Sequence, residues 1–147
     1  MGKNYSRFEP VTITASAART ATGNGSAVAL LEGFKECNGV IFVLDLTNAA
    51  TDAGDTLDVF VQARLDNTPN WVDVVHFTQI LGNGSDNLTY VAKVLTSGAN
   101  TEFEIGSALG AASVRNLMAY DIRARWAIVD SGDADQTFTF SIWAVPV

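Results

Sequence analysis

The chain has 147 residues, 48% of them hydrophobic, which is enough for the core of one domain. Its formal net charge is −7, and a field of this sign repels phosphate, so we expect no nucleic-acid partner. The N-terminus has no apolar signal segment and no run of about 18 apolar residues occurs, so we expect a soluble protein without a secretion signal or membrane span. Short aromatic and β-branched runs broken by Gly, Asn and Asp predict an all-β class.

Three strands are predicted near the start of the chain. Residues 11–14 and 26–31 flank a Gly-Asn-Gly turn at residues 23–25. Residues 40–44 are continuously apolar and are bounded by turn residues. Such a run is typical of a central strand that is covered on both faces.

The middle of the chain is predicted to fold as a meander. Residues 57–64 alternate between apolar and polar, residues 66–70 supply a turn, and residues 71–80 return as the second strand of a hairpin. The turn at residues 82–85 contains an Asn-Gly pair, and residues 88–95 are predicted to return from it as the next strand.

Alternation is clearest near the C-terminus. Residues 122–128 and 138–144 place apolar side chains at every second position, and the linker at residues 130–135 consists of turn-forming residues. These two strands are therefore predicted to form a hairpin. Residues 101–105 are predicted to form a further strand, and residues 107–116 a loop or a short helix.

The spacing of these segments predicts one antiparallel β-sandwich or jelly roll of about nine strands over residues 11–147. Residues 1–10 are predicted to form an N-terminal arm, because alternation has not yet begun there and Pro10 suits the start of an edge strand. Lys3 and Arg7 make this arm basic, whereas the body of the protein is acidic. We expect Lys3 and Arg7 to contact an acidic surface of a neighbouring protein.

Residue types that carry out catalysis are sparse. His76 is the only histidine and Cys37 the only cysteine, so a histidine metal site, a serine triad and a cysteine zinc site lack partners. We interpret His76 as structural and Cys37 as a small buried hydrophobic residue. Glu102 and Glu104 would share one strand face, as the acid and nucleophile of a glycosidase do, but two exposed carboxylates are commoner. We predict a non-enzymatic protein with no catalytic residue and no cofactor.

The turn at residues 130–135 is a candidate for metal binding. Asp130, Asp133 and Asp135 could supply oxygen ligands to calcium. The turn lacks the order of acidic residues and the distal glutamate of an EF-hand. We predict that this turn is solvated, blocks edge-to-edge association and is not a metal site. The sequence leaves open whether the turn binds calcium.

Two large side chains fall on otherwise polar strand faces, Phe60 and Trp143. Exposed groups of this size mark interfaces, so we predict that Phe60 and Trp143 contact other subunits. A stacking platform for sugar rings is the alternative. Its candidate rings are Trp71, Trp126, Trp143, Tyr90 and Tyr120, although Trp126 alternates with core residues.

Several motifs occur in an order that resembles one family. They are Leu57-Asp-Val-Phe-Val-Gln-Ala-Arg-Leu-Asp66, Trp71-Val-Asp-Val, Phe77-Thr-Gln-Ile80, Tyr120-Asp-Ile-Arg-Ala-Arg-Trp126 and Phe138-Thr-Phe-Ser-Ile142. Over roughly the C-terminal two thirds, this order resembles small structural proteins of tailed bacteriophages. The shared positions are architectural, so no functional residue is carried over from the family.

The resemblance implies a virion structural protein made in the host cytoplasm. It points to a capsid decoration (cementing) protein that binds at junctions of capsid subunits and stabilises the shell, or to a neck or tail subunit. It also implies a homo-oligomer, often a trimer, that binds the major capsid protein or another virion protein. A carbohydrate-binding β-sandwich module and a glycosidase remain as alternatives.

Overall fold

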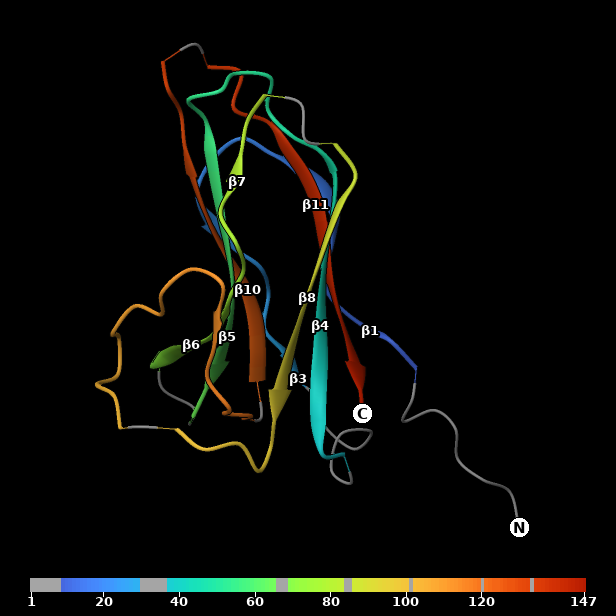
Figure 1. The fold of residues 1–147 in the computed structure, drawn as a ribbon, viewed down its shortest axis with the longest axis vertical. Helices are drawn as coiled ribbons and strands as arrows, with labels where there is room; N and C mark the ends of the chain where they lie inside the picture. Colours follow the sequence, from blue (N-terminus) through green and yellow to red (C-terminus); the bar gives the residue numbers. More distant parts are fainter. Residues whose placement is uncertain are drawn as a thin grey trace.

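The computed structural model describes residues 9–29, 37–65, 69–83, 86–100, 102–119, 121–132 and 134–147. Within these ranges, eleven strands form two antiparallel sheets that pack face to face (Figure 1). This arrangement confirms the predicted all-β sandwich. The strands outnumber the prediction because four of them are only two residues long and show no alternation. In the described part of the chain, no helix has the length and hydropathy needed to cross a membrane.

One sheet contains four strands in the order β1–β11–β4–β8, and each neighbouring pair is antiparallel. The strands are β1 (Val11–Arg19), β4 (Gly39–Asn48), β8 (Leu88–Leu95) and β11 (Phe138–Pro146). β4 lies inside this sheet, as predicted for residues 40–44. Phe42 and Leu44 point into the core, and Val43 is buried on the opposite face, where Ile41 is only half-buried. The outer face of β4 is therefore covered only in part.

The other sheet has seven strands and is built around the pair β5 and β10. Its order is β2–β10–β5–β6–β9, with β3 also paired to β10 and β7 to β5. The strands are β2 (Gly23–Asn24), β3 (Val28–Ala29), β5 (Thr56–Arg64), β6 (Trp71–His76), β7 (Ile80–Leu81), β9 (Ser113–Val114) and β10 (Asp121–Val129). β6 and β7 both pair with β5, which confirms the hairpin predicted for residues 57–64 and 71–80.

The predicted hairpin between residues 122–128 and 138–144 is wrong. β10 pairs with β5 in one sheet, whereas β11 pairs with β1 and β4 in the other, so the chain crosses the sandwich between them. The predicted meander is also wrong at residues 88–95, because β8 pairs with β4 instead of continuing beside β7. Both sheets offer an inward apolar face, so alternation alone does not reveal which sheet a strand joins.

Three shorter segments differ from their predictions. Residues 23–25, predicted to be a turn, include β2, which pairs with β10. Residues 102–105 lie in a loop and do not form a strand. The segment 107–116 contains β9, which pairs with β6. Of residues 26–31, Val28–Ala29 form β3, and residues 30 and 31 lie outside the described part.

Alternate residues of both sheets fill the core. Phe138, Phe140 and Ile142 of β11 are fully buried. Trp126 of β10 is also buried and meets the ring of Phe140 edge-on, with 5.8 Å between ring centroids. This contact joins the two sheets and confirms the predicted core position of Trp126.

Several connections between strands meet at one end of the sandwich, and a long connection lies beside β6. The connections from β4 to β5, from β7 to β8 and from β10 to β11 all reach the same end of the sandwich, at the top of Figure 1. The long β8–β10 connection lies beside β6, where the Arg115 amide donates a hydrogen bond of 2.8 Å to the Val74 carbonyl. The Leu109 amide of the same connection donates a hydrogen bond of 3.3 Å to Asp73 Oδ2, so this loop also covers part of the outer face of its sheet. The other sheet has no such cover among the described residues.

Candidate interaction surfaces

The outward face of the four-stranded sheet carries a cluster of apolar side chains. Trp143 of β11 pairs with Val43 of β4, which pairs in turn with Val91 of β8. Two positions along, Val145 pairs with Ile41. Val91 is 64% exposed, and Trp143, Val145 and Ile41 are half-buried. We call these five residues the outer apolar face.

A groove extends this face toward β1. It has a volume of about 500 Å³ and is lined by Trp143 and Ser141 of β11 and by Pro10 and Thr12 at the start of the chain's first strand. One side of Trp143 therefore borders the groove, while the ring also belongs to the outer apolar face. This position suits an interface anchor, and the contact of Trp143 with another subunit stays a prediction.

Phe60 does not occupy the exposed position that the sequence predicted. Its side chain is 7% exposed. The ring stacks on His76 of β6 with 4.0 Å between centroids, and the Arg125 guanidinium of β10 lies 4.7 Å from the ring centroid. Both neighbours are cross-strand partners of Phe60. The expectation of an exposed ring is wrong, because β5 is flanked on both sides by strands with large side chains at this register.

The outer face of the seven-stranded sheet holds a network of charged side chains. Gln62 accepts a hydrogen bond from Arg123 Nε and donates one to Asp73, each of 2.8 Å. Arg64 forms an ion pair with Asp121. Burial lowers the pKa of Arg123. Repulsion from Arg125 and Arg64 lowers this pKa further, whereas attraction to Asp73 opposes the shift. The cations on this face are thus already engaged with neighbours in the same sheet.

A polar pocket of about 200 Å³ lies on this second face. Its lining includes Gln62, Trp71, Asp73 and Arg125, which is the combination of a ring and polar groups expected of a sugar site. The pocket is smaller than the roughly 300 to 1,000 Å³ of ordinary ligand sites. The guanidinium groups of Arg64 and Arg123 lie 5.1 and 4.3 Å from the Trp71 centroid. This geometry is less favourable to a sugar platform than the free ring that the sequence suggested.

His76 is buried in a structural network. Its Nδ1 lies 2.8 Å from the Leu109 carbonyl and its Nε2 lies 2.9 Å from Asp58 Oδ1. Both partners are acceptors, so the two hydrogen bonds form together when each ring nitrogen carries a proton. The histidine thereby ties β6 to β5 and to the β8–β10 connection. Asp58, which brings a carboxylate to the ring, was not singled out from the sequence.

We expect His76→Ala to lower the free energy of unfolding by about 1–3 kcal/mol, because it removes the stack on Phe60 and two hydrogen bonds. Urea denaturation of the purified variant measures this loss. Gln79→Ala is the matched control, because Gln79 is exposed and, among the described contacts, donates one hydrogen bond, of 2.8 Å, to Asp58 Oδ2. Equal losses for the two variants would contradict a structural role for His76.

The other candidate residues lie apart from these surfaces. Glu102 and Glu104 are exposed in a loop, so they do not share a strand face as predicted. Cys37 is half-buried just before β4. Lys3 and Arg7 lie outside the described residues, and their contact with an acidic partner stays a prediction.

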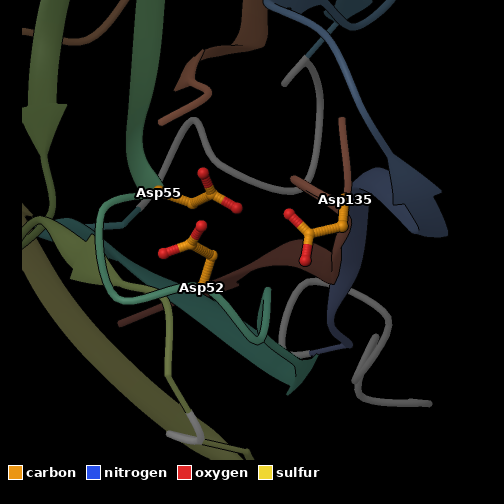
Figure 2. Close-up of side chains that lie close together, drawn as sticks. All are labelled: Asp52, Asp55 and Asp135. Carbon is orange, nitrogen blue, oxygen red and sulfur yellow. The ribbon is translucent and has the colours of Figure 1, made fainter. Parts of the chain in front are cut away.

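Asp130 and Asp135 of the acidic turn have different neighbours in the structure. Asp130 Oδ1 accepts a hydrogen bond of 2.8 Å from the Gly132 amide within the turn, and Asp133 lies outside the described residues. Asp135 instead meets Asp52 and Asp55 of the β4–β5 connection, with one carboxylate oxygen of each within 4.8 Å of the others (Figure 2). The sequence did not predict that these two connections meet.

Comparison with protein family models, with curated protein sequences and with solved structures gives no significant match.

Proposed function

We propose that this protein is a structural subunit that assembles through its outer apolar face, and that the assembly is a virus particle in which it acts as a capsid decoration protein. The observation that carries the assembly proposal is the apolar row of Trp143, Val43 and Val91 on a sheet face that no described loop covers. Solvent contact with such a row is unfavourable, and a partner surface removes it from water.

The opposite face of the sandwich supports this choice of surface. There the large rings are engaged by neighbouring side chains, with Phe60 against His76 and Trp71 near two guanidinium groups. The β8–β10 connection also lies against that face, where the Leu109 amide donates a hydrogen bond of 3.3 Å to Asp73 Oδ2 and the Leu109 carbonyl lies 2.8 Å from His76 Nδ1. Docking on that side would first displace existing contacts, whereas the four-stranded sheet presents its apolar face directly.

The size of the sheet face sets the number of contacts needed. Four strands spaced about 4.8 Å apart, with eight to ten residues at about 3.3 Å each, give a face on the order of 500 Å². A standard interface takes roughly 800 Å² from each partner. The contact therefore extends beyond the sheet, and the groove beside Trp143 is the adjoining surface that would supply the rest.

The first partner is a second copy of this chain, and the resulting oligomer then binds the capsid. Closed symmetric oligomers are the usual form of soluble assemblies, and a trimer suits a decoration protein of the family that the sequence resembles. Each copy that binds at a junction of capsid subunits adds buried apolar area, which raises the free energy needed to separate the shell. A neck or tail position would use the same surface with a different virion protein.

We expect the purified protein to be a symmetric oligomer at micromolar concentration, and Trp143→Ala to weaken this assembly at least about tenfold with little loss of protomer stability. Val91→Lys should act similarly, because Val91 is the most exposed residue of the outer apolar face and the lysine places a charge there. Size-exclusion chromatography with light scattering measures the oligomer, and thermal unfolding checks the fold. Val129→Lys is the matched control, because Val129 is 56% exposed but belongs to the other sheet.

A strictly monomeric wild-type protein would overturn the assembly proposal, as would equal effects of Val91→Lys and Val129→Lys. The virion proposal has its own test, which is binding of the purified protein to shells that lack it. Density at capsid junctions in a reconstruction supports decoration, and density only at the neck or tail favours the other position. Binding to glycans that depends on Trp71 and not on Trp143 would support the carbohydrate-binding alternative instead.

A further inference from the structure

Three carboxylates converge at the end of the sandwich where the loops meet. Asp52 and Asp55 belong to the β4–β5 connection, and Asp135 belongs to the β10–β11 connection. One oxygen from each carboxylate lies within 4.8 Å of the other two. In Figure 2 the three side chains point toward a common centre. Residues that are about 80 positions apart in sequence are therefore held as one oxygen-rich cluster.

Asp55 supplies the observation that goes beyond a mere acidic cluster. Its side chain is fully buried. Oδ1 accepts hydrogen bonds from the Ser131 amide and the Ser131 hydroxyl, at 2.8 and 3.0 Å, whereas Oδ2 is buried without a hydrogen-bond partner. Burying a carboxylate oxygen without a hydrogen-bond partner is strongly unfavourable, and a proton or a cation bound to this atom would offset that cost.

The surrounding loops hold the carboxylates in place. Asp52 Oδ1 accepts a hydrogen bond of 3.1 Å from the Gly54 amide, and Asp135 Oδ2 accepts one of 3.2 Å from the Thr51 hydroxyl. The carbonyl oxygen of Asp55 accepts a bond of 2.8 Å from the Gly82 amide. The like charges are thus kept close by backbone and hydroxyl donors, which prevents them from moving apart to relieve repulsion.

We propose that Asp52, Asp55 and Asp135 bind a divalent cation, and that calcium fits the site best. Carboxylate oxygens are the ligands of hard cations, and calcium accepts an irregular set of six to eight oxygens. Asp135 is exposed, so water can complete the coordination. Zinc prefers nitrogen and sulfur ligands, which this carboxylate cluster does not provide.

The cation would join the two sheets. The β4–β5 connection follows a strand of the four-stranded sheet, and the β10–β11 connection follows a strand of the other sheet. A cation shared by Asp55 and Asp135 ties these connections together at the end of the core. It binds the folded chain and not the unfolded one, so it stabilises the fold by mass action.

The test measures calcium binding and thermal unfolding of the full chain. With a Kd of about 0.1 mM, about 10 mM calcium is expected to raise Tm by roughly 5–10 °C over a chelator-treated sample at equal ionic strength. Asp135→Asn should weaken calcium binding at least about tenfold and abolish most of the Tm shift. Without calcium the same variant should be at least as stable as the wild type, because a repelling charge is gone. Asp55→Asn should lose binding as well.

Asp130→Asn is the matched control, because Asp130 lies in the same connection but bonds only within its own turn among the described contacts. Calorimetry with calcium chloride alone should show one site in the wild type and in this control. Magnesium should bind more weakly. If Asp55→Asn does not fold, Asp135→Asn alone tests the proposal, because Asp135 is exposed. The absence of any calcium-dependent Tm shift would overturn the proposal, and equal losses of calcium binding in the Asp130 and Asp135 variants would also overturn it.

Discussion

Replacing Arg19 by alanine is expected to lower the free energy of unfolding by about 2–3 kcal/mol. Arg19 is the last residue of β1, and its guanidinium group lies 4.2 Å from the centroid of Phe140 and 4.6 Å from that of Trp126. Nη1 donates a hydrogen bond of 2.7 Å to the Phe140 carbonyl, and Nη2 donates one of 3.1 Å to the Thr14 hydroxyl. The side chain thus closes the edge of the core where β1 and β10 come together.

The magnitude follows from the partly buried contacts alone. The two bonds to Phe140 and Thr14 are partly buried and charge-assisted, and each contributes about 1 kcal/mol. The contacts with the two rings add about 0.5–1 kcal/mol. Two further bonds, to the carbonyls of Ala15 and Ala17, are exposed to water and add little. The Arg19 side chain is half-buried, and this partial removal from water lowers its pKa.

Urea denaturation measures this effect, and Arg19→Lys is the matched control. Lysine keeps the charge and the length of the side chain, but it lacks the planar fork that bonds two carbonyls while stacking on rings. We expect Arg19→Lys to recover less than half of the loss. A loss in Arg19→Ala of under about 0.5 kcal/mol, as for an ordinary surface residue, would contradict the role of Arg19 in closing the core.

Gly82→Ala is expected to destabilise the protein by about 3 kcal/mol or more and to lower Tm by roughly 10 °C. Gly82 is buried where the β7–β8 connection contacts the β4–β5 connection. A Cβ atom there would overlap the carbonyl oxygen of Asp52 and lie 3.2 Å from that of Ala50. Both obstacles are backbone atoms, so no change of rotamer relieves the overlap.

The cost arises because the two connections would have to separate. The amides of Gly82 and Asn83 donate hydrogen bonds of 2.8 and 2.7 Å to the carbonyls of Asp55 and Ala50. Moving the chains apart breaks these bonds in a buried place. Thermal unfolding measures the loss. Gly110→Ala is the control, because the nearest atom to its Cβ would be the Ser113 hydroxyl oxygen at 3.8 Å. A Gly82 variant as stable as this control would show that the connections are not packed as described.

The strands and their buried faces follow largely from the sequence. Alternation over residues 138–144 correctly placed Phe138, Phe140 and Ile142 in the core, and Trp126 was correctly placed there too. These assignments succeed because the side-chain period of a strand is two residues and is a local property. The hairpin of β5 with β6 succeeds for the same reason, since its connection is short.

The exposure of Phe60 could not be inferred in this way. A large ring among polar residues is exposed on an isolated strand, but here His76 and Arg125 lie on either side of it at the same register. Its burial depends on which strands flank β5. Neither neighbour is close to Phe60 in the sequence, so no local pattern contains this information.

The sequence by itself determined that the protein is an antiparallel β-sandwich and which faces of its main strands are apolar, because both properties follow from the short-range alternation of apolar and polar residues. Only the tertiary structure decided that β10 and β11 lie in different sheets, that Val91 of the outer apolar face is exposed while Phe60 is covered, and that Asp55 and Asp135 meet. Each of these depends on the pairing of distant segments, and turn residues do not specify whether a chain returns in its own sheet or crosses to the other.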